Sequence, residues 1–82
     1  MTTLNLGHLA TFRLVVQRGS FSTAADVMGI SQPAVSLQIR QLEQFLQTRL
    51  IERTGRGIKA TAAGEALRVH GERLELAVEE TI

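Results

Sequence analysis

Side chains suited to hydrogen bonding with a ligand gather between residues 32 and 40 of this 82-residue chain. In a helix of about 100° per residue, Pro33, Leu37 and Arg40 share one side. Gln32 lies at its tip and Ser36 on its flank. Glutamine can pair with adenine, arginine with guanine, and an aliphatic group can contact the thymine methyl. This face therefore favours reading of a DNA major groove. An ordinary solvated face is the alternative, which the outward, apolar Leu37 disfavours.

A second group of side chains suits contact with phosphate. Arg53, Arg56 and Lys59 fall within seven residues, and Gly55 and Gly57 between them would let the backbone approach a phosphodiester chain closely. Such cations give affinity and a steep salt dependence rather than sequence choice. The alternative is a solvated turn with no ligand.

Residues for catalysis or for holding a metal are sparse. The chain has no Cys, one Asp and two His, and the histidines His8 and His70 lie 62 positions apart. No nucleophile–base set, paired carboxylates, metal-ligand spacing or phosphate loop is present. We therefore expect no enzyme activity, no cofactor and no metal. We interpret His70 as a partly buried interface residue.

Helical spacing of apolar residues dominates the chain and positions the first of these groups. We expect a first helix over residues 6–18, capped by Asn5 and ended by Gly19. A short helix that Ser22 caps would end at Gly29, and a third, capped by Ser31, would span residues 32–46. A short helix, a glycine turn and a second helix over residues 21–40 match the helix-turn-helix spacing. An αα-hairpin without a ligand shares this pattern.

Residues after the third helix change character. Residues 50–53 and 58–60 are expected to pair as a small hairpin, with turn residues at 54–57, and Thr61 to open a fourth helix that continues to Ile82. The fold class predicted is mainly α: a winged helix-turn-helix of three helices plus a two-stranded β-hairpin wing, followed by a long linker helix. Residues 4–61 would form the DNA-binding domain, with the wing at 50–60, and residues 62–82 the linker.

The fourth helix carries two apolar sides where a monomer needs one. We expect one side to pack on the parent domain and the other on a second copy, giving a homodimer. The residues assigned to dimerisation are Ala62, Leu67, Val69, Leu74, Leu76 and Val78. Charge divides in the same way, because residues 1–61 carry seven Lys or Arg against three acids and residues 62–82 carry two against five. A dimerisation module that does not bind DNA is the second hypothesis.

Five segments together resemble the N-terminal DNA-binding domain of LysR-type transcriptional regulators. They are residues 19–25 (GSFSTAA), 31–36 (SQPAVS), 38–43 (QIRQLE), 50–57 (LIERTGRG) and 61–64 (TAAG). The resemblance covers nearly the whole chain. It implies a linker helix that pairs with a second subunit, and binding to an interrupted inverted repeat near promoters. It also implies a C-terminal domain that senses a small-molecule effector, which we expect to lie outside this sequence, and a tetramer in the full-length protein is a further possibility.

The resemblance and the side-chain chemistry together predict the contact residues. We expect base readout from Gln32, Pro33, Ser36, Leu37 and Arg40, and contacts with the DNA backbone from Ser22, Thr23, Ser31, Arg53, Arg56 and Lys59. Three positions depart from the family pattern. Leu37 replaces a usual polar or basic residue, and Gln47 replaces a usual helix-stopping glycine, which would lengthen the third helix or strain its end. Ile51 stands where an aromatic residue is frequent, a mild change in packing.

Long apolar runs and secretory signals are missing from the printed sequence. No run approaches the ~18 residues that a membrane span needs, and Met1, Thr2 and Thr3 do not begin a secretory signal. We expect no membrane partner and a cytoplasmic, nucleoid-associated protein. Because the sequence stops inside a predicted helix, we expect it to be a piece of a longer regulator.

Overall fold

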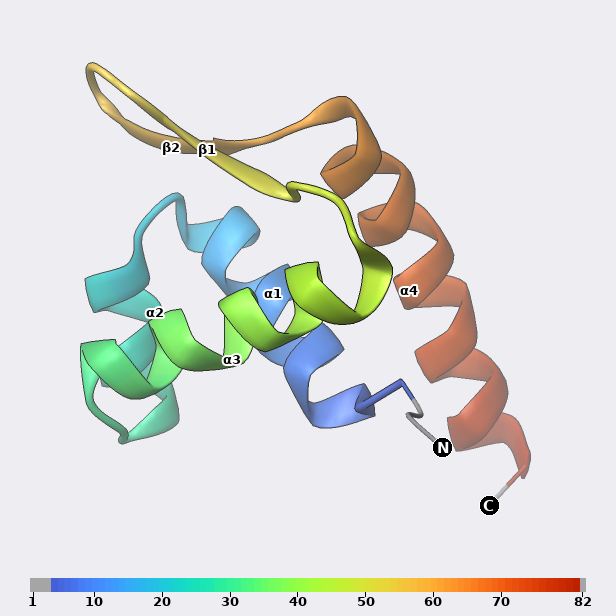
Figure 1. Ribbon diagram of the computed structural model, residues 1–82. Helices are drawn as coiled ribbons and strands as arrows, with labels where there is room; N and C mark the ends of the chain where they lie inside the picture. The colour runs from blue at the N-terminus through green and yellow to red at the C-terminus, as the bar shows by residue number, and fades with distance from the viewer. Residues whose placement is uncertain (1–3, 82) are drawn as a thin grey trace.

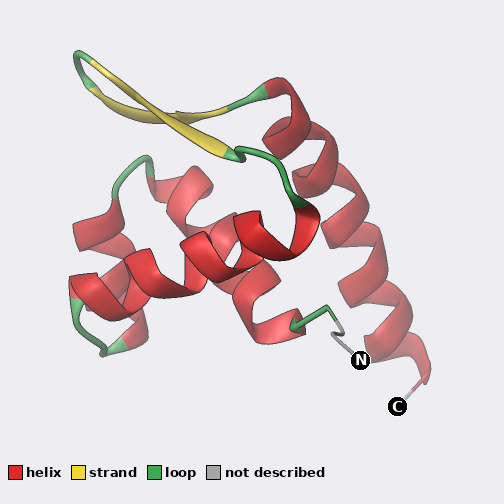
Figure 2. Cartoon of the chain, viewed as in Figure 1, coloured by secondary structure: helices red, strands yellow, loops and turns green. Residues whose placement is uncertain are grey.

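Three helices, a two-stranded hairpin and a fourth, long helix make up the computed structural model (Figures 1 and 2). It describes residues 4–81, with the side chains of residues 4–71 and 73. The elements are α1 (Leu6–Arg18), α2 (Phe21–Met28), α3 (Gln32–Leu46), β1 (Ile51–Thr54), β2 (Gly57–Ala60) and α4 (Ala62–Thr81). The predicted winged helix-turn-helix fold with a linker helix is confirmed.

Polar caps and left-handed residues set the helix boundaries. Asn5 accepts a hydrogen bond from the His8 amide at 3.1 Å, and Ser31 accepts one from the Ala34 amide at 3.2 Å, as predicted. The prediction of Ser22 as the cap of α2 is wrong. Ser20 is the cap, and its Oγ accepts from the Thr23 amide at 3.1 Å. Ser22 instead lies in the first turn of α2 with its side chain exposed.

Gln47 follows directly after Leu46, the last residue of α3. The helix is not lengthened, because Gln47 itself adopts the left-handed conformation, with φ 54° and ψ 42°. A side chain with a Cβ is strained there, whereas glycine is not. Leu46, the last residue of α3, is 36% exposed, whereas Val35, Ile39 and Leu42 on the same helix are buried.

The core lies between the three helices and the base of the hairpin. Its buried apolar residues are Leu9, Phe12, Val15, Ala24, Ala25, Val35, Ile39, Leu42, Leu50 and Ile51. A polar pair joins α1 to α3 beside them, where the hydroxyl of buried Thr11 donates to Gln38 Oε1 at 2.6 Å. Gln38 stands at a position of the helix-turn-helix motif that is expected to be apolar. Here its side chain instead forms a polar contact between α1 and α3.

The hairpin is longer by one pair than the sequence predicts. Thr54, the last residue of β1, pairs with Gly57, the first residue of β2, so the loop is only Gly55 and Arg56, and Leu50 lies before β1. Gly57 has φ 138°, and a Cβ there would lie 3.3 Å from the carbonyl oxygen of Gly19. The hairpin therefore passes close to the turn between α1 and α2, as Figure 1 shows.

Helix α4 packs along α1 with one of its two apolar sides. Leu67 is half-buried against the core of its own domain, and its assignment to dimerisation stays a prediction. Gly71 is buried, and a Cβ there would lie 3.0 Å from the side chain of Leu9. Val69 (37% exposed), Ala62 and His70 are all exposed, so His70 is not partly buried in the single chain. Leu74, Leu76 and Val78 lie outside the residues whose side chains are described.

Candidate nucleic-acid interface

The outer face of α3 presents the predicted base-reading side chains to solvent. Gln32, Pro33 and Arg40 are exposed, Leu37 is 48% exposed, and Ser36 is half-buried on the flank. Pro33 is tolerated in the first turn because its missing N–H would have no helical partner there. The inward residues Val35, Ile39 and Leu42 hold this face outward by packing in the core.

A groove joins the start of α3 to the wing. It has a volume of about 310 Å³ and is lined by residues from α2, α3 and both strands. Four of the predicted contact residues line it: Ser22, Gln32, Arg53 and Arg56. The fold thus brings one predicted base-reading residue and three predicted backbone-contacting residues to a single concavity, although Gln32 and Arg56 are 24 positions apart in the sequence.

A second hollow, of about 220 Å³, extends the first along α3. Ser36, Arg40 and Arg53 are among its lining residues. Arg53 therefore lines both concavities, and its guanidinium lies 5.8 Å from the centroid of the Phe21 ring. A cation over an aromatic face is attracted by the ring quadrupole. This contact holds the Arg53 guanidinium beside the start of α2, where Phe21 also lines both concavities.

Three predicted backbone-contacting residues lie outside these two concavities. Lys59 faces Glu52 across the hairpin, with Nζ 3.5 Å from the carboxylate oxygen, so its charge is already paired. Ser31 uses its hydroxyl as the helix cap described above. Thr23 is exposed in the first turn of α2. The groove and the second hollow therefore contain only part of the predicted set.

Two residues without a predicted role, Glu43 and Arg49, lie in the last turn of α3 and in the connection to β1. Arg49 lines the second hollow, and its side chain is 78% exposed while its Nε lies 3.6 Å from Glu43. Glu43 turns back toward the base of the wing. An acidic residue three positions before the last residue of a helix, followed by a short connection to a strand, was the only signal in the sequence for a contact between Glu43 and the wing.

Within the described residues, no group of three or more His, Cys, Asp or Glu could hold a metal ion. None of the helices in that part of the chain is long and apolar enough to cross a membrane. The candidate interface comprises hydrogen-bonding and cationic side chains from α2, α3 and the wing, with Leu37 exposed on the outer face of α3.

Comparison with known proteins decides the family. The model of bacterial regulatory helix-turn-helix proteins of the lysR family matches residues 6–65. The chain belongs to the LysR family. An uncharacterized HTH-type transcriptional regulator of the ibpB–leuC intergenic region of Azotobacter vinelandii is 42% identical over 78 residues, which are 95% of this chain and 54% of that protein. A probable RuBisCO transcriptional regulator of Cyanidioschyzon merolae is 45% identical over 93% of this chain and 25% of its own length.

Solved LysR structures share the fold closely. The BenM DNA-binding domain in complex with catB site 1 DNA superposes with a TM-score of 0.89 at 37% identity, covering 95% of this chain and 84% of that one. Vibrio fischeri DarR in complex with DNA gives a TM-score of 0.91 at 28% identity, covering 98% of this chain and 27% of its own. This LysR-family chain therefore spans about half of one curated relative and about a quarter of another.

Proposed function

We propose that this chain is the DNA-binding domain of a LysR-type transcriptional regulator and binds double-stranded DNA sequence-specifically. The recognition helix α3 would enter the major groove of each half of an interrupted inverted repeat, and the wing would contact the backbone or minor groove. Gln32, Pro33, Ser36, Leu37 and Arg40 would read bases, and Ser22, Thr23, Ser31, Arg53, Arg56 and Lys59 would contact the backbone.

The observation that supports this proposal most is the shared groove of Gln32, Arg53 and Arg56. Amide and guanidinium groups at the tip of an exposed helix suit base edges, and the wing cations beside them suit the flanking phosphates. An interaction domain with no nucleic-acid ligand would have no need to place both groups in one concavity. The similarity to LysR domains solved with DNA supports the same function.

The domain boundaries and partners belong to the same proposal. Residues 4–61 would form the reading head and residues 62–82 the linker helix of a homodimer, which could assemble further into a tetramer in the whole protein. An effector-binding domain would follow in the whole protein. A regulator of this kind is not an enzyme and acts in the cytoplasm on the nucleoid. The side of α4 with exposed Ala62 and Val69 supports the dimer.

Selection of bound duplexes from a random pool would supply the operator on which the proposal can be tested. Gln32→Ala should then reduce the preference for operator over mismatched duplex by roughly tenfold, because a bidentate base contact is lost. Arg56→Ala should weaken binding to all duplexes about equally and lower the salt slope by about one. Gln17→Ala on α1 and Arg73→Ala on α4 are the matched controls. Unchanged preference in Gln32→Ala would show that α3 does not read bases.

The second candidate function is dimerisation without DNA binding, which the exposed outer side of α4 would serve alone. Equilibrium sedimentation together with fluorescence titration of a random duplex separates the two functions. A dimer with no salt-sensitive affinity for the duplex would favour this second function.

A further inference from the structure

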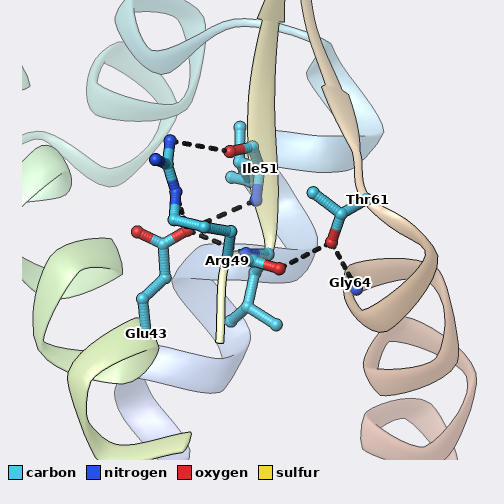
Figure 3. A network of polar contacts seen from close by, with 6 residues as sticks. Glu43, Arg49, Ile51, Thr61 and Gly64 are labelled. Carbon is cyan, nitrogen blue, oxygen red and sulfur yellow. Dashed lines mark hydrogen bonds and ion pairs between the residues drawn. The ribbon is translucent and has the colours of Figure 1, made fainter. Parts of the chain in front are cut away.

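The carboxylate of Glu43 holds the connection between the recognition helix and the wing. Its Oε2 accepts hydrogen bonds from the amide of Leu50 at 2.8 Å and from the amide of Ile51 at 3.4 Å (Figure 3). The Glu43 side chain is only 17% exposed, and Arg49 Nε lies 3.6 Å from the same oxygen. One α3 residue thus anchors the first residue of β1 and the residue before it.

The same connection is held from the opposite side by the start of α4. The Thr61 hydroxyl donates to the Arg49 carbonyl at 2.7 Å and accepts from the Gly64 amide at 3.0 Å. The Thr61 amide donates to the Leu50 carbonyl at 3.0 Å. Figure 3 shows the connection running between Glu43 on one side and Thr61 with Gly64 on the other.

Close packing leaves little freedom for this joint to move. A Cβ on Gly64 would overlap the Leu50 carbonyl oxygen and lie 3.0 Å from its carbonyl carbon. Leu50 and Ile51 are 1% and 5% exposed. The amide of Leu50 is therefore a buried donor whose partner is Glu43, and a buried donor left without a partner is unfavourable.

The joint determines where the wing cations lie relative to α3. Arg53 stands two residues after Ile51 on the same strand, and it lines both concavities of the interface. A tilt of β1 about its first residue would carry Arg53 and Arg56 away from Gln32. We propose that Glu43 is a positioning residue for DNA recognition, which sets the angle between wing and recognition helix without touching DNA. This inference rests on the proposed function.

Length and charge of the side chain can be separated by two substitutions. Glu43→Gln keeps the side-chain length and one oxygen acceptor but removes the charge. Glu43→Asp keeps the charge but is one methylene shorter, so its carboxylate cannot reach the Leu50 amide without movement of the connection. If Glu43 positions the wing through its hydrogen bonds, Glu43→Gln should preserve duplex binding and Glu43→Asp should not. A role of Glu43 through its charge alone predicts the reverse order.

The test measures duplex affinity against salt concentration for the unmodified chain, Glu43→Gln, Glu43→Asp and Glu43→Ala. For Glu43→Asp and Glu43→Ala we expect affinity to fall by about tenfold or more. The slope of log K against log salt should also become less steep by about two, since two phosphate contacts are misplaced. For Glu43→Gln we expect the slope of the unmodified chain. The inference would be overturned if Glu43→Asp and Glu43→Ala kept the slope and affinity of the unmodified chain. It would also be overturned if Glu43→Gln lost duplex affinity while Glu43→Asp kept it.

Hydrogen exchange of the Leu50 and Ile51 amides, measured by NMR without DNA, tests the joint separately. Exchange of these two amides should accelerate in Glu43→Asp and Glu43→Ala but not in Glu43→Gln. The Val35 amide in the core should stay protected in all variants, which would show that they remain folded. If the unmodified chain shows no salt-sensitive affinity for any duplex, the proposed function fails and this inference with it. If the unmodified chain binds and all variants match it, this inference alone fails.

Discussion

The base and the tip of the wing are held in different ways. At the base, Leu50 and Ile51 are buried, and their backbone groups bond to Glu43 and Thr61. At the tip, Gly55 and Arg56 are exposed, and the hydrogen bond recorded there runs from the Arg56 amide to Thr54 Oγ1 at 3.3 Å. The hairpin is thus held by hydrogen bonds and packing at its base, whereas its tip, which carries Arg56, is exposed to solvent.

This difference separates orientation from attraction. Buried hydrogen bonds and close packing define one geometry, because leaving any of the groups unpaired is unfavourable. Exposed cations adapt to a phosphate chain at little cost, and an exposed ion pair such as Lys59–Glu52 contributes little to stability. Mutations at the base should therefore change stability and geometry, whereas mutations at the tip should change charge alone.

Gly64→Ala at the base should have the largest effect on stability. Alanine favours a helix by about 1 kcal/mol over glycine, but the new Cβ would overlap the Leu50 carbonyl oxygen, which is a backbone atom. We expect a net destabilisation of about 3 kcal/mol, at the upper end for overpacking. Denaturant unfolding followed by circular dichroism measures this change.

Gly55→Ala at the tip is the matched control for that substitution. A Cβ on Gly55 would meet nothing within 4 Å, so we expect a change within about 0.5 kcal/mol. Equal destabilisation by the two substitutions would remove the distinction between base and tip.

Thr61→Ala should have the next largest effect. It removes the hydroxyl that caps α4 through the Gly64 amide and donates to the Arg49 carbonyl. Loss of such a cap reduces stability by about 1 kcal/mol. Thr61→Ser keeps the hydroxyl and should stay near the unmodified stability in the same unfolding experiment. A serine variant as unstable as the alanine variant would show that the methyl group, not the hydroxyl, matters.

The sequence predicted the helices well because their signals are local. The bounds of α1 and α3 follow from apolar spacing with Asn5, Gly19 and Ser31 as boundary residues, and each of these signals acts within one turn. The cap of α2 was misplaced because Ser20 and Ser22 both precede an apolar run. Only the backbone conformation, extended at Ser20 with φ −160°, distinguishes the two serines.

Contacts between distant residues could not be predicted from these local patterns. Gln38 has an apolar position in the motif, and its partner Thr11 lies 27 residues earlier. Glu43 has the spacing of an ordinary surface acid, and its role depends on the path of the chain after Gln47. The sequence shows which side chains have the chemistry for a DNA contact, but which of them line the groove depends on the tilt of the hairpin. Lys59 shows this, since it pairs with Glu52 outside the groove.

Gln47→Gly should raise stability by a smaller amount. Gln47 begins the connection to the wing base in a left-handed conformation that disfavours residues with a Cβ. Part of the gain is offset by the greater freedom of glycine in the unfolded chain, so we expect about 0.5 kcal/mol. Gln47→Ala keeps the Cβ and should give no gain in the same unfolding experiment. A gain from alanine as large as that from glycine would contradict relief of backbone strain.

Acidification should weaken an exposed contact on α4 slightly. The Arg68 guanidinium donates to Glu65 Oε1 from Nε at 2.9 Å and from a terminal nitrogen at 2.6 Å. These hydrogen bonds, with a lesser contribution from the Arg68 charge, hold the pKa of Glu65 below its ordinary value of 4.5, against an opposing effect of desolvation. Because the folded pKa is the lower one, the contribution to stability is complete above the ordinary pKa and is lost as pH falls through the folded pKa.

An NMR titration of the Glu65 carboxyl carbon measures this pKa directly, and Arg68→Met should return it toward the ordinary value. A pKa that is unchanged by Arg68→Met would exclude Arg68 as the cause, and a large loss of stability in this range would contradict the small contribution expected of solvent-facing charge on α4.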